Sequence, residues 1–158
     1  MKNGQRMHLA FRVSATKLSG KAKAAIKVNS AAMKKYAARY QAYLNEIKTS
    51  LENMFDRWRK EKLSVCIFGA GTHTQFFLNI LNLRENDIVC IVDSDPAKHG
   101  KVIAGSKFKI LPPSAINEMH IDVVLVSSAS LQDELIDQLH NMGVRSRIVK
   151  IYPRPEYL

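Results

Sequence analysis

Several features that would assign a chemistry are missing from this 158-residue sequence. Its only two cysteines, Cys66 and Cys90, lie within apolar stretches, where they are expected to be buried, so no disulfide framework is predicted. The sequence has no Walker A lysine, no G-x-S-x-G nucleophile elbow and no His/Cys cluster with metal-ligand spacing. No run approaches the eighteen or so apolar residues of a membrane span. We therefore predict no metal site, no complete catalytic constellation, no transmembrane segment and a reducing, cytoplasmic location.

Negatively charged residues are also missing from the first part of the chain, where the first acidic residue is Glu46. Residues 1–62 carry 15 Lys/Arg against 4 Asp/Glu, whereas residues 63–158 carry 9 against 10. Apolar residues make up 46% of the sequence, which is enough for a real core. We predict two parts: a basic helical arm over residues 1–62 and a nearly neutral α/β domain over residues 63–158.

The arm reads as one long helix from about Lys21, since neither glycine nor proline occurs between Lys21 and Leu63. Apolar side chains recur there at spacings of three and four, which predicts a continuous stripe: Met33, Ala37, Tyr40, Leu44, Ile47, Leu51, Met54 and Trp58. The stripe has to be buried. Two readings stay open, namely a homo-oligomer or partner contact through residues 33–58 and packing of the helix on its own α/β domain.

Basic residues such as Lys34, Lys35 and Arg39 lie off this stripe. They indicate a solvated face or a weak, unspecific contact with a polyanion, either RNA or an anionic membrane surface. Residues 1–20 contain Ser and basic residues but no acid, so an organelle transit peptide is a minor alternative.

Apolar runs alternate with helical patterns after residue 62, which predicts parallel strands joined by right-handed crossovers. The fold class is therefore α/β, a Rossmann-like parallel sheet of order 3-2-1-4-5 preceded by the long basic amphipathic helix. The expected strands are 63–68, 88–93, 108–111, 121–126 and 147–152, and the expected helices are 72–83, 114–119 and 131–142. Thr72 and Ser130 are the expected N-caps of the first and last of these helices.

A glycine turn follows the first strand, and an acid follows the second. Gly69 and Gly71 fit a turn that lets a phosphate approach backbone amides and the start of the next helix. Asp93 comes 22 residues after Gly71, where an acid would accept a ribose hydroxyl, with Asp95 as a competitor for that role. The G-x-G-x-x-G fingerprint is incomplete, because Thr74 stands where its third glycine belongs. A tight βα turn without a ligand is the simpler alternative.

Loops that follow the first, second and fourth strands should converge at the carboxyl edge of the sheet. The serines after residue 126 would face the glycine turn across this crevice. His73 could donate to a ligand or transfer a proton, but no nucleophile–base partner for it is evident. The predicted cofactor-binding residues are Gly69, Ala70, Gly71, Thr72, His73, Thr74, Asp93, Ser94, Ser127 and Ser128, and no residue is predicted to be catalytic.

Three stretches together resemble a known group of proteins: VCIFGAGTHTQFFL, IVCIVDSDPAKHGKVIAG and IDVVLVSSASLQDELIDQL. They are similar to Rossmann-like domains of bacterial polysaccharide biosynthesis. These include the N-terminal domain of sugar O-acyltransferases, the CoA-binding-like domain of polysaccharide epimerases and the C-terminal domain of sugar C-methyltransferases. The resemblance covers residues 63–152 and implies a domain that binds a nucleotide-sugar, a dinucleotide or a related phosphate ligand, while the chemistry often belongs to another domain.

Three functions follow from these observations. The first is a nucleotide, dinucleotide or nucleotide-sugar binding module, accessory to surface-glycan biosynthesis, with NAD(P) or a nucleotide-sugar as the ligand. The second is a small NAD(P)-dependent or sugar-modifying enzyme that uses His73. The third is an interaction protein that assembles through its basic helical arm.

Overall fold

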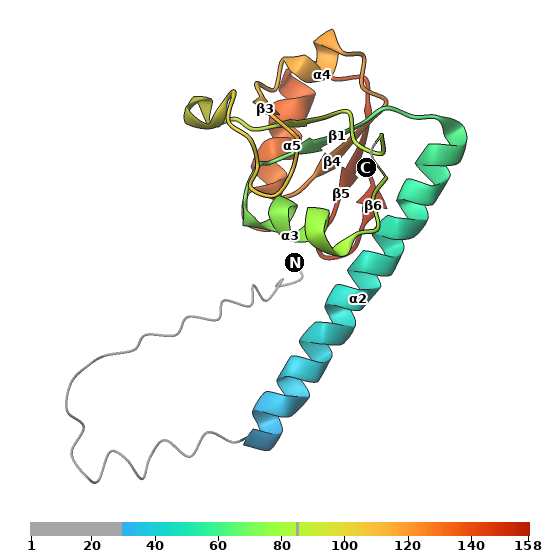
Figure 1. Ribbon diagram of the computed structural model, residues 1–158, viewed down its shortest axis with the longest axis vertical. Coiled ribbons are helices and arrows are strands. Elements are labelled where there is room, and N and C mark those ends of the chain that lie inside the picture. Colours follow the sequence, from blue (N-terminus) through green and yellow to red (C-terminus); the bar gives the residue numbers. More distant parts are fainter. Residues whose placement is uncertain (1–29, 85) are drawn as a thin grey trace, which may run out of the picture. The chain divides into compact units, whose positions relative to one another are not determined.

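The computed structural model describes residues 30–84 and 86–158 of the chain (Figure 1). The described chain falls into two units, of which the first includes residues 30–38 and the second is formed by residues 39–158. The long helix α2, Ser30–Glu61, runs from the first unit into the second. The part of the predicted helix before residue 30 lies outside the described residues. The domain boundary predicted after residue 62 stays a prediction.

Within the described residues, six strands form one sheet in the order β3-β2-β1-β4-β5-β6, which confirms the predicted order 3-2-1-4-5. The five predicted strands run parallel to one another. They are β1 Val65–Phe68, β2 Cys90–Val92, β3 Ile110–Leu111, β4 Val123–Val126 and β5 Arg147–Lys150. The short β6, Glu156–Tyr157, adds antiparallel to β5. The sequence did not predict it, because two exposed residues beyond two prolines carry no strand pattern.

The helices after α2 are α3 Thr72–Ile80, a 3₁₀ turn at Pro96–Lys98, α4 Ala115–Glu118 and α5 Gln132–Asn141. Both predicted N-caps are wrong. Gly71 is the N-cap of α3 and Leu131 that of α5, neither with a side-chain capping bond. The Ser128 hydroxyl accepts a hydrogen bond from the Leu131 amide instead, since the loop places it three residues before that amide.

Side chains of the strands alternate between two apolar cores, as the two-residue period of a strand requires. In β1, Val65 and Ile67 belong to the core on the side of α2 and α3. Cys66 and Phe68 belong to the other core, with α4 and α5. Both faces of the sheet are therefore covered, which is why its strands read as unbroken apolar runs. Cys66 and Cys90 are free and buried, as predicted, opposite each other on neighbouring strands.

The second half of α2 supplies much of the first core. Ile47, Leu51 and Trp58 are at most 1% exposed and cluster with residues of β1, β4 and β5. The Trp58 indole also donates a 2.7 Å hydrogen bond to the hydroxyl of Tyr157 in β6. Of the two readings left open for the apolar stripe, packing on the same chain therefore applies to this half. Met33 and Tyr40, in the first half, are exposed.

Among the described residues, no helix combines the length and the apolar character needed to cross a membrane.

Candidate functional site

The candidate site lies at the carboxyl edge of the sheet, where β1 and β4 are neighbours. After β1 the chain enters α3, which packs on one face of the sheet, and after β4 it enters α5, which packs on the other. The two connections therefore diverge and leave a crevice between them, the position at which ligands bind in open α/β sheets. A 2.9 Å hydrogen bond between the hydroxyls of Thr74 and Ser127 joins the two loops at its base.

The two glycines of the turn have different roles. Gly69 has φ of +107°, and a Cβ built on it would lie 3.0 Å from the carbonyl oxygen of Ser127. Backbone conformation and space thus both demand glycine there. Gly71 has extended backbone, φ −108° and ψ −169°, and a Cβ on it would meet no atom within 4 Å. Neither the backbone conformation nor any neighbouring atom of the described residues requires glycine at position 71, so the absent side chain leaves open space at the start of α3.

Thr74, which replaces the third glycine of the fingerprint, is fully buried. Its hydroxyl donates to the carbonyl oxygen of Gly69 and is hydrogen-bonded to Ser127, itself only 4% exposed. Both hydroxyls thus make hydrogen bonds within the protein beneath the turn, and the ligand contacts predicted for Thr74 and Ser127 stay predictions. The two hydroxyls hold the loops after β1 and β4 together, a role that threonine can fill and glycine cannot.

Asp93 ties the end of β2 to the glycine turn. One carboxylate oxygen accepts from the Ala70 amide at 2.7 Å and from Lys98 Nζ at 2.9 Å, and the other accepts from the Asp95 amide at 2.9 Å. Burial opposes ionisation of this side chain. The two amides and Lys98 outweigh burial, so the pKa of Asp93 lies below its usual value. Asp95, the competing acid, accepts from the amide of Ala97 and caps the 3₁₀ turn.

These bonds predict that ionised Asp93 stabilises the fold. Because its pKa is lower in the folded state, this contribution is complete above about pH 5 and is lost as pH falls through the folded pKa. We expect the melting temperature to fall between pH 6 and pH 3, and to fall less steeply in Asp93→Asn. Thermal unfolding across this range tests the expectation, with Asp137→Asn on the exposed side of α5 as the matched control. Equal slopes for Asp93→Asn and the unmodified protein would contradict it.

Ser94 follows β2 and Ser128 follows β4, and both are less buried than Ser127. The Ser94 hydroxyl donates to the side-chain oxygen of Gln138 in α5 at 2.6 Å, which links the β2 loop to that helix. Ser128 accepts from the Leu131 amide at 3.1 Å and still has a hydroxyl proton to donate. The first two residues of α3, Thr72 and His73, are exposed.

The structure supplies the partner for His73 that the sequence did not. The Tyr152 hydroxyl lies 2.9 Å from Nδ1 of His73, and the two rings are 5.3 Å apart between centroids. Tyr152 follows β5, so it reaches the crevice from the strand next to β4. Sequence reasoning missed it because 79 residues separate the pair and no spacing rule connects them. The only available signal was its place at the carboxyl end of a strand.

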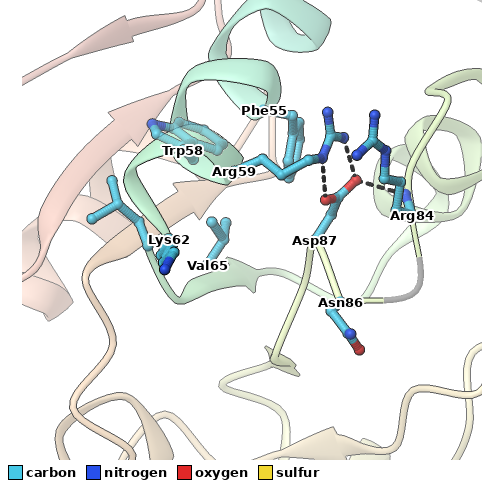
Figure 2. Close-up of a pocket in the computed structure, with 9 residues that line it drawn as sticks. Phe55, Trp58, Arg59, Lys62, Val65, Arg84, Asn86 and Asp87 are labelled. Atoms are coloured by element: carbon cyan, nitrogen blue, oxygen red, sulfur yellow. Dashed lines mark hydrogen bonds and ion pairs between the residues drawn. The ribbon is translucent and has the colours of Figure 1, made fainter.

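A cavity of about 460 Å³ lies at the opposite edge of the sheet, near the starts of β1 and β2 (Figure 2). In Figure 2, Arg59 reaches from α2 to Asp87, and Arg84 lies on the other side of this carboxylate. Arg59 makes two hydrogen bonds to Asp87, at 2.9 and 2.7 Å, and Asp87 also accepts from the Arg84 amide. Arg59 and Asp87 are paired with each other, so their contact links α2 to the loop that precedes β2. We place the candidate site at the carboxyl edge, where the loops converge.

Within the part of the chain that the structure describes, no three His, Cys, Asp or Glu side chains are grouped closely enough to hold a metal ion.

The mostly parallel sheet, the glycine turn after β1 and the acid after β2 define a Rossmann-like domain. The chain belongs to the family described as the C-methyltransferase C-terminal domain, which matches residues 12–152. This confirms one of the resemblances drawn from the sequence. No curated protein matches the chain.

Solved structures that match part of the chain include UDP-D-quinovosamine 4-dehydrogenase from Vibrio fischeri, at 24% identity and a TM-score of 0.44. That match covers 58% of this chain and 79% of the other. RSP, a Rex-family repressor, matches at 19% identity and a TM-score of 0.39, and its complex with beta-NADH matches at 19% and 0.38. Both RSP matches cover 58% of this chain, which spans 46% of each RSP chain.

Proposed function

We propose that the carboxyl edge of this sheet binds the phosphate groups of a nucleotide-sugar or dinucleotide. The observation that carries the proposal is Gly71, which lacks a side chain where neither its backbone conformation nor its neighbours require glycine. It is the N-cap of α3, so the space it leaves open adjoins the unpaired amides and the positive dipole end of that helix. An anion placed there would meet these donors directly.

The other roles follow from this position. Ala70, Gly71 and Thr72 would surround the phosphates, and the Thr72 hydroxyl is free of the capping role predicted for it. Asp93 would accept a ribose or sugar hydroxyl, since its three hydrogen bonds leave acceptor capacity on a carboxylate with about four acceptor sites. Ser94 and Ser128 would contact the ligand from the β2 and β4 loops.

The family favours a nucleotide-sugar over other phosphate ligands, because C-methyltransferases of this kind act in sugar biosynthesis. We propose an accessory binding role in surface-glycan biosynthesis. The alternative is a small NAD(P)-dependent or sugar-modifying enzyme in which His73 transfers a proton. The hydrogen bond between His73 and Tyr152 supports this alternative, because proton transfer by His73 needs a partner. Turnover that depends on His73 would distinguish this alternative.

A thermal-shift screen tests the binding role. The panel contains NAD(H), NADP(H), CoA and UDP-, GDP- and dTDP-sugars. A ligand that binds only the folded state stabilises it by about 2.7 kcal/mol at a hundredfold excess over its dissociation constant. We expect one nucleotide class to raise the melting temperature. No shift with any member of the panel would contradict the proposal.

We propose a second role for the first described half of α2, because Met33, Tyr36 and Tyr40 remain exposed there. Apolar side chains at helical spacing suit contact with a second copy of the chain. We expect Tyr40→Glu to shift the oligomer towards monomer in light scattering at a fixed protein concentration, with Gln41→Glu as the control for the added charge. A protein that is monomeric before mutation would contradict this role. Polyanion binding by the neighbouring basic residues stays a prediction.

A further inference from the structure

We infer that Tyr152 is a positioning residue that holds His73 in the tautomer carrying its proton on Nε2, so that His73 donates a hydrogen bond to a ligand phosphate oxygen. The inference rests on the proposed function for its ligand. It adds Tyr152, which no sequence pattern identified, and it names the chemical group that His73 recognises.

Tyr152 is held in place from two helices. Its backbone carbonyl accepts from Gln132 Nε2 at 2.8 Å, and its amide donates to Gln132 Oε1 at 2.9 Å. Gln132 is the first residue of α5 and is only 9% exposed. The Tyr152 ring also lies 6.5 Å from that of Phe77, a buried residue of α3. Gln132 thus fixes the backbone of Tyr152 and Phe77 contacts its ring, so the phenol can orient a third group without large entropic cost.

A hydrogen bond from Tyr152 to His73 needs a phenol that carries its proton. Burial raises the pKa of Tyr152, and the neighbouring Tyr43 and Tyr40 of α2 raise it further, so the phenol keeps its proton at neutral pH. Among the described residues, Nδ1 of His73 is the group that the structure pairs with this hydroxyl. A phenol can donate to Nδ1 or accept from an Nδ1–H, so the distance alone fits both neutral tautomers. We assign the phenol as the donor, which leaves Nδ1 as acceptor and places the proton of the neutral ring on Nε2.

The position of His73 decides which ligand group this donor meets. His73 is the second residue of α3 and is exposed, two positions after the open space at Gly71. The positive end of the helix dipole stabilises a negatively charged oxygen at this position, and a phosphate supplies such an oxygen. A neutral ring with its proton on Nδ1 would instead present a lone pair at Nε2 and repel the phosphate. Holding the His73 proton on Nε2 thus favours the binding of a phosphate oxygen.

The first test measures the tautomer and needs no ligand. Long-range ¹H–¹⁵N NMR correlations at about pH 8.5, where an ordinary imidazole is neutral, report which nitrogen carries the proton. We expect the His73 ring to be protonated at Nε2 alone, and to become a mixture of tautomers in Tyr152→Phe. The spectrum of His73→Ala identifies the signals, and Tyr36→Phe on α2 is the control. A ring protonated at Nδ1, or one unchanged by Tyr152→Phe, would overturn the inference.

The second test measures binding of inorganic pyrophosphate by calorimetry. We expect Tyr152→Phe to weaken binding about fivefold, the effect of one neutral hydrogen bond. In the His73→Ala background the same change should have no further effect, because Tyr152 would act through His73. A purely structural role would weaken binding in both backgrounds and would overturn the inference.

The two failures are distinguishable. Binding that is lost in Gly71→Val but equal in Tyr152→Phe and the unmodified protein would leave the proposed function intact and overturn the role of Tyr152. If neither pyrophosphate nor any nucleotide binds, the proposed function fails and the ligand role of His73 is overturned with it.

Discussion

Gly71→Val is expected to abolish nucleotide binding without unfolding the protein. The extended backbone at position 71 suits a β-branched residue, and a Cβ there meets no atom within 4 Å, so we expect the free energy of unfolding to change by less than about 0.5 kcal/mol. The isopropyl group would occupy the space through which a phosphate reaches the first amides of α3. Affinity should fall by at least about a hundredfold, equivalent to about 2.7 kcal/mol.

The measurement is the thermal-shift screen repeated on the variant. Its melting temperature without ligand should match that of the unmodified protein, and the shift with the active nucleotide class should disappear. Gly69→Ala is the matched control, because its φ of +107° and the 3.0 Å approach to the Ser127 carbonyl oxygen predict a loss of stability instead. Retention of full affinity by Gly71→Val would refute the phosphate site at this turn.

Trp58→Ala is expected to destabilise the α/β unit by about 3–5 kcal/mol, the usual cost of removing a large buried aromatic side chain. Trp58 is 1% exposed and packs edge-on against Phe55, with ring centroids 4.8 Å apart. The Trp58 indole also donates a hydrogen bond to the Tyr157 hydroxyl. Removal of Trp58 therefore leaves a cavity on the α2 side of the sheet and removes one of the hydrogen bonds that hold β6. Chemical denaturation at equilibrium measures the change in the free energy of unfolding.

Two further variants make this result interpretable. Trp58→Phe keeps an aromatic ring and loses the bond to Tyr157, so it should cost less than Trp58→Ala while still folding. Asn53→Ala, on the same helix but exposed, should change stability by less than about 0.5 kcal/mol. If Trp58→Ala proved no more costly than Asn53→Ala, the second half of α2 would not be part of the core.

Much of the candidate site could be predicted from local patterns. Gly69, Gly71 and Asp93 were identified because a strand, a turn and an acid occur in a fixed order, and the structure brings them together through the Ala70–Asp93 hydrogen bond. The role of Thr74 was not predictable, since the fingerprint assigns this position to helix–strand packing and says nothing of the hydroxyl of Ser127. Tyr152 was missed for the same reason: its partner lies on another element, and only the sheet order brings the two together.

The sequence by itself determined the α/β class, the strand order and the crevice between β1 and β4, because hydrophobic period, glycine turns and right-handed crossovers are local constraints. It also determined that α2 has an apolar stripe. Only the tertiary structure decided what covers that stripe. Ile47, Leu51, Met54 and Trp58 are buried in one core with strands of their own sheet, while Met33 and Tyr40 remain exposed. The physical reason is that burial of an apolar face is non-directional, so the pattern demands a partner surface without specifying which one.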